Sequence, residues 1–105
     1  MRNQGKLATI VFGLIPLFLA SGCGQPQIGA DREVFKSVDA LYTAVSLRDP
    51  GLLAGCDDRL KGLSEAGKLP PTASASLASI VDEARADRWE SAQDRLSRFI
   101  EGQRR

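Results

Sequence analysis

Histidine is absent from the 105 residues of this sequence, and its absence narrows the possible chemistry. Histidine is the side chain whose ordinary pKa lies closest to neutral pH, and it is the commonest metal ligand in proteins. Without it, neither a histidine-based catalytic triad nor a zinc site built on imidazole can form. No nucleophile, base and orienting group can be assembled from the other residues, so we expect no enzyme activity, no metal and no cofactor.

The sequence also lacks an excess of charge of either sign and any segment with the alternating pattern of a β-strand. Its formal net charge is +1, from 14 basic and 13 acidic side chains. A nearly neutral chain has no electrostatic preference for the phosphate backbone of nucleic acid, and we expect no nucleic-acid partner. Hydrophobic residues make up 43% and charged residues 26%, which is typical of a single globular domain. The missing strand patterns predict that this domain is all-α.

An apolar segment near the N-terminus has the layout of a secretory signal. Arg2 and Lys6 form a basic region, and an uncharged run of 17 residues follows over 7–23. This length is at the lower limit for crossing a bilayer, and Gly13 and Pro16 weaken a continuous helix. Two alternatives stay open, namely an uncleaved membrane anchor and cleavage by the ordinary signal peptidase.

The segment ends in Leu19-Ala20-Ser21-Gly22-Cys23, which resembles the lipobox of bacterial lipoproteins. The resemblance implies that the Cys23 thiol carries a diacylglycerol, that the chain is cut between Gly22 and Cys23, and that the new amino group is acylated. Residues 1–22 would then be the signal peptide of a lipid-anchored protein of the cell envelope. Gly24 stands where some lipoproteins retained in the inner membrane carry aspartate, so the outer membrane is favoured. The chain as a whole resembles small helical envelope lipoproteins, a class that implies no particular activity.

After the lipobox, residues 23–30 are polar and rich in glycine and proline, and they predict a flexible tether. The domain is expected over 31–103, where apolar residues recur at helical spacing in four segments. These segments begin at Asp31, Asp49, about Pro71 and Asp87. Their apolar stripes comprise Val34, Val38, Leu41 and Val45; Leu53, Cys56, Leu60 and Leu63; Ala73, Leu77, Ile80, Val81 and Ala84; and Trp89, Ala92, Leu96, Phe99 and Ile100.

The ends of these helices carry recognisable signals. Asp31 and Asp49 are predicted N-caps, and Asp87 with Glu90 three residues later has the spacing of a capping box. Gly67 is placed for a left-handed helix end. Four short amphipathic helices with tight connections fold as antiparallel neighbours, so we predict a small up-down bundle made of two helical hairpins.

Cys56 is the second of the two cysteines and lies within an apolar stripe, where a cysteine is usually a small core residue. If Cys23 carries lipid, Cys56 has no partner for a disulfide within the chain. The alternative is a functional free thiol that senses redox state or joins two copies covalently, because compartments outside the cytoplasm permit disulfides.

Few other residues are candidates for a site. Asp57 and Asp58 point in different directions on a helix and are predicted to be solvated. Trp89 is predicted to be a core residue, with contact to a ligand as the alternative. Tyr42 is a candidate for the edge of a binding groove. Further along, Arg104 and Arg105 form a local positive excess that could touch anionic lipid. The sequence therefore predicts a non-catalytic interaction or scaffold module, tethered to a membrane by lipid, that binds a larger envelope protein or a second copy of itself.

Overall fold

A computed structural model describes residues 24–103 and shows that this part of the chain is all-α, as predicted. The helices are α2 (Arg32–Leu47), α3 (Pro50–Glu65), α4 (Pro71–Arg85) and α5 (Trp89–Glu101). The lipobox with Gly22 and Cys23 lies outside the described residues, as do Arg104 and Arg105.

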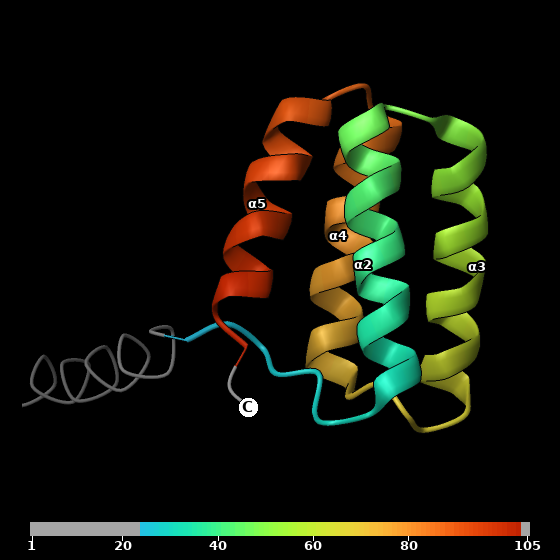
Figure 1. The fold of residues 1–105 in the computed structure, drawn as a ribbon, viewed down its shortest axis with the longest axis vertical. Coiled ribbons are helices and arrows are strands. Elements are labelled where there is room, and N and C mark those ends of the chain that lie inside the picture. The colour runs from blue at the N-terminus through green and yellow to red at the C-terminus, as the bar shows by residue number, and fades with distance from the viewer. Residues whose placement is uncertain (1–23, 104–105) are drawn as a thin grey trace, which may run out of the picture.

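The helices form an up-down bundle in which each helix runs antiparallel to the next (Figure 1). Neighbours in sequence pack together, and α5 also packs against α2, so the ring of helices is closed. The apolar stripes meet in one core, with Val34, Leu41, Leu96 and Phe99 fully shielded from solvent. Within residues 24–103 there is no β-strand, and no helix has the length and apolar character to cross a membrane.

Aspartate caps start the first two helices, which confirms the predictions for Asp31 and Asp49. The Asp31 carboxylate accepts hydrogen bonds from the backbone N–H groups of Glu33 and Val34, at 2.8 and 3.2 Å. Asp49 accepts equivalent bonds from residues 51 and 52, at 2.9 and 3.0 Å, and Pro50 occupies the first helical turn. Each cap satisfies N–H groups that have no partner within the helix.

The capping box predicted at the start of α5 is wrong. Arg88 is the N-cap residue there, and no side chain caps the helix. Asp87 instead adopts a left-handed backbone with φ of 69°, and its carboxylate accepts a hydrogen bond of 2.9 Å from the Trp89 indole N–H. The carboxylate therefore accepts a hydrogen bond from the indole and none from the backbone N–H groups at the start of α5.

The segment predicted as a flexible tether packs against the bundle, and Ile28 is the residue of this segment that is buried. Only 2% of Ile28 is exposed, and its backbone N–H donates to the Gln103 side-chain oxygen at 2.8 Å. The Gln103 amide nitrogen donates in turn to the carbonyls of Pro26 and Phe99, at 2.8 and 2.9 Å. The chain is thus fixed to the end of α5 before α2 begins, so residues 25–28 of the predicted tether contact the bundle.

Gly102 allows this close approach. A Cβ atom at position 102 would lie 2.7 Å from Cγ and 2.9 Å from Cβ of Gln25, closer than carbon atoms pack. The Gly102 carbonyl also accepts a hydrogen bond of 2.9 Å from the Gln27 side chain. Glycine is required here by the neighbouring segment, because its own φ of −83° suits any residue.

The core assignment predicts a large effect of truncating Leu96. Leu96→Ala should lower the free energy of unfolding by about 2 to 5 kcal/mol, because the side chain is fully buried and leaves a cavity. Leu47→Ala is the control, since Leu47 is 65% exposed, and we expect a change within about 0.5 kcal/mol. Urea denaturation measures both, and equal effects would show that α5 presents a different face to the core.

Docking of the N-terminal segment predicts opposite effects of two glycine substitutions. Gly102→Ala should lower the free energy of unfolding by about 1 to 2 kcal/mol, because Gln25 must move away. Gly62→Ala in α3 meets no atom within 4 Å and should raise it by about 0.5 to 1 kcal/mol, the usual gain in a helix. Thermal denaturation distinguishes the two, and a Gly102→Ala protein as stable as Gly62→Ala would contradict the docking.

Candidate functional site

A groove between α2 and α5 holds the predicted site residue Tyr42. It consists of two hollows of about 130 and 240 Å³ that share Asp39 and Ile100. We call it the α2–α5 groove, and its lining comprises Ile28, Phe35, Val38, Asp39, Tyr42, Ser97, Ile100, Glu101 and Gln103. Phe35, Tyr42 and Ile100 pack against the core but stay partly exposed. The groove therefore offers aromatic and aliphatic surface beside two exposed carboxylates.

Tyr42 is held in place by polar neighbours on both sides of this groove. Hydrogen bonding with Gln93 and Ser97 of α5, and with Ser46 of α2, lowers the pKa of Tyr42 below its ordinary value. Gln93 also donates to the Ser46 hydroxyl at 3.3 Å. An aromatic ring with a polar end is a good contact surface, because a tyrosine has few rotatable bonds and loses little side-chain entropy on binding.

Trp89, the other aromatic candidate, is part of the core. It is 9% exposed, and its indole N–H is already bonded to Asp87. This placement agrees with the core role that the sequence favoured and leaves Trp89 little surface for a partner.

Cys56 lies in the core stripe of α3 as a free cysteine and is 8% exposed. Burial raises the pKa of the Cys56 thiol, and the nearby Arg59 opposes this shift only in part. Because the thiolate is the reactive form, the raised pKa and the burial both disfavour attack by this sulfur at neutral pH.

The prediction that Asp57 is solvated is wrong, although Asp58 is exposed as expected. The Asp57 side chain is 5% exposed and pairs with Lys61 at 3.1 Å and with Arg85 at 3.0 Å. The Arg85 pair joins α3 to α4, and both cationic partners reach solvent. Asp57 therefore has a structural role, and we assign it no chemistry.

A separate hollow lies between α2 and α3, and the sequence pattern did not lead us to expect it. Its volume is about 440 Å³, and it is lined by Arg32, Glu33, Lys36, Ser37 and Arg59. We call it the α2–α3 hollow. A serine three residues after Val34, on the buried face of α2, was the available signal, since an apolar residue is expected there.

The site residues form no arrangement suited to a metal. Among residues 24–103, no group of three or more cysteine, aspartate or glutamate side chains could hold a metal ion. Comparisons with protein-family models, with curated proteins and with solved structures give no significant match. The surfaces of the chain itself are therefore the guide to its function.

The burial of Cys56 predicts slow chemical labelling. In a Cys23→Ser protein, where Cys56 is the remaining thiol, iodoacetamide should react at pH 7.5 at least about tenfold more slowly than with the same chain unfolded in urea. The free energy of unfolding should also fall as the pH rises past about 8.5. Above this pH the thiol ionises in the unfolded chain, whereas burial keeps it protonated in the folded one. Mass spectrometry follows the labelling. Rapid labelling of the folded protein, or a dimer that reductant dissolves, would favour the thiol function instead.

Proposed function

We propose that this protein is a lipid-anchored component of the bacterial cell envelope that acts by contact and not by catalysis. Cys23 carries the lipid, the outer membrane is the favoured location, and the helical domain binds a larger envelope protein. The lipobox resemblance supports the anchor, and the lack of histidine supports a role without catalysis.

The α2–α5 groove is the observation that carries the binding function. Its floor is aromatic and aliphatic, and its rim carries the carboxylates of Asp39 and Glu101. A groove between two antiparallel helices fits an amphipathic helix laid along it, with apolar positions facing the floor. The acidic rim selects a helix that places lysine or arginine beside those apolar positions.

A different protein suits this groove better than a second copy of the chain. In a symmetric dimer the same patch meets itself, so the Asp39 and Glu101 carboxylates of the two copies would lie close together. Like charges facing each other in an interface are unfavourable. We therefore commit to a basic amphipathic helix of a larger envelope protein as the occupant.

The docked N-terminal segment supports a partner site near the membrane, provided that Cys23 carries the lipid. Ile28 lines the groove and follows Cys23 by five residues, which span at most about 18 Å when extended. One end of the groove therefore stays within that reach of the lipid anchor. A partner that lies along the groove meets the protein close to the bilayer surface.

Photo-crosslinking in cells tests this function. A photoreactive phenylalanine analogue at Tyr42 should give a reproducible adduct with one envelope protein. The same analogue at Leu52, which is 48% exposed and lies outside the groove, is the matched control and should not give this adduct. Reversing both rim charges, by Asp39→Lys and Glu101→Lys, should lower the adduct yield about tenfold, because basic residues of the partner are then repelled.

Three results would overturn the proposal. They are no adduct at Tyr42, equal adducts at Tyr42 and Leu52, and an adduct whose mass is twice that of the chain. The last would show self-association through the groove.

A further inference from the structure

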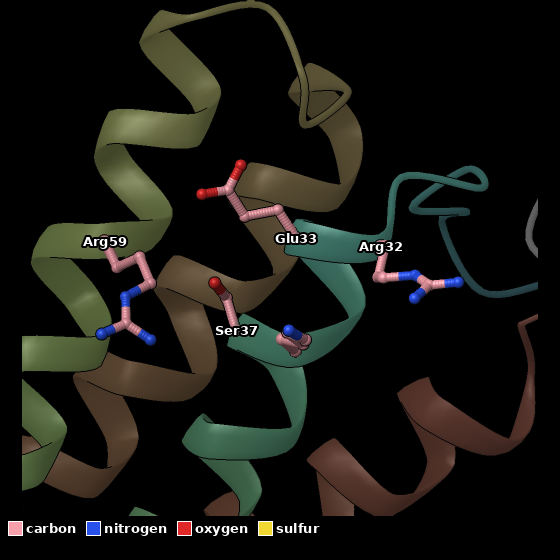
Figure 2. A pocket seen from close by; sticks show the side chains of 5 residues that line it. Arg32, Glu33, Ser37 and Arg59 are labelled. Atoms are coloured by element: carbon pink, nitrogen blue, oxygen red, sulfur yellow. The ribbon is translucent and has the colours of Figure 1, made fainter.

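The α2–α3 hollow has a buried hydroxyl group at its centre and ionic groups around it. Figure 2 shows the Ser37 side chain directed from α2 into the space beside α3, with Glu33 and Arg59 on either side. Arg32 also lines the hollow, but its guanidinium is directed away from Ser37. Ser37 and Lys36 come from α2 and Arg59 comes from α3, so the packing of the two helices assembles the hollow.

Ser37 lacks the partner that a buried hydroxyl normally has. It is 1% exposed, and within the described part of the chain its oxygen has no hydrogen-bond partner. A buried polar atom without a partner costs free energy, and nearly all such atoms in folded proteins are paired. An alanine here would avoid that cost and favour the helix. A serine at this position therefore points to a bound group that completes the hydrogen bond.

The charges around the hollow select the sign of that group. Lys36 and Arg59 form no ion pair with any residue between 24 and 103. Glu33, the carboxylate in the lining, is paired with Lys68 at 3.3 Å. The hollow therefore has two cations without a counter-charge and one acid whose charge is offset, and it favours an anion.

We propose that the α2–α3 hollow binds a phosphate group, with Ser37 and Arg59 as its hydrogen-bond donors and Lys36 as a further positive charge. Phosphate suits this donor set because it has several acceptor oxygens, and arginine pairs with two of them at once. A volume of about 440 Å³ accommodates the phosphate together with the part of the molecule that carries it.

The phosphate has two possible sources that share this chemistry. Glu33 and Ser37 lie in the first half of α2, at the end of the bundle where the docked N-terminal segment enters (Figure 1). If Cys23 is lipidated, this end faces the bilayer, and the head group of an anionic phospholipid is within reach. A small soluble phosphate ester is the other source, and it does not depend on the anchor.

Nuclear magnetic resonance of the full-length protein tests the site. In neutral detergent micelles, titration with inorganic phosphate at constant ionic strength should shift the backbone amide signals of Ser37 and Arg59 and saturate. Arg59→Gln should weaken the affinity about tenfold, because a charge-assisted hydrogen bond is lost. Ser37→Ala should weaken it about fivefold while leaving the melting temperature unchanged or higher, a combination that a purely structural serine would not give.

A second arm uses lipid nanodiscs of phosphatidylcholine with and without phosphatidylglycerol. In one outcome, the same amide signals shift only in nanodiscs that contain phosphatidylglycerol and not with inorganic phosphate. That result would assign the site to a lipid head group. Arg98→Gln is the control of equal charge change, since Arg98 is exposed on α5 and pairs with Asp94 at 2.7 Å, and it should leave the affinity unchanged. No localised shift in either arm, or equal affinity in Arg59→Gln, would overturn the proposal.

Discussion

Burial of Ile28 is the constraint on which the placement of the other surfaces depends. This residue joins the N-terminal segment to the end of α5, through the hydrogen bonds that Gln103 makes with it and with Pro26. The proposed lipid at Cys23 is then separated from the folded bundle by a few residues. With that lipid in a bilayer, the domain could not range freely above the membrane, and the end of the bundle that contains Ile28 would stay near the bilayer. The tether thereby becomes part of the proposed binding surface.

Helix α2 contributes to both candidate surfaces, and its charges differ between them. On the side of α5 it presents Asp39 beside Phe35 and Tyr42, so the α2–α5 groove is apolar with an acidic rim. Toward α3 it contributes Lys36 and Ser37 to the α2–α3 hollow, which Arg59 of α3 also lines. This division would allow one small domain to hold the proposed basic partner helix and the proposed phosphate group at the same time. The net charge of +1 for the whole chain does not show that charge is distributed unequally over the two sides of α2.

The sequence predicted those features that depend on local rules. The apolar stripes, the caps at Asp31 and Asp49 and the left-handed Gly67 follow from helical spacing and backbone preference, and the structure confirms them. Prediction from the sequence failed at Asp57 and Ile28, where contacts distant in sequence decide the outcome. Asp57 is buried because Arg85 reaches it from α4, and Ile28 is buried because Gln103 holds it from beyond α5. The capping box at Asp87 failed for a local reason, because the Asp87 carboxylate accepts a hydrogen bond from the indole N–H of Trp89, two residues later. The α2–α3 hollow is lined by residues of two helices, and the spacing of residues within one helix does not predict how two helices pack against each other.

The lipid anchor at Cys23 is the central claim, and the intact mass of the protein extracted from membranes tests it most directly. We predict a chain that begins at Cys23 with the added mass of a diacylglycerol and an acyl group, and the loss of this species in a Cys23→Ser protein. A full-length unmodified mass would contradict the account. The apolar segment would then remain as an anchor, Cys23 would be a free thiol that could pair with Cys56, and the placement of both surfaces relative to the bilayer would no longer follow.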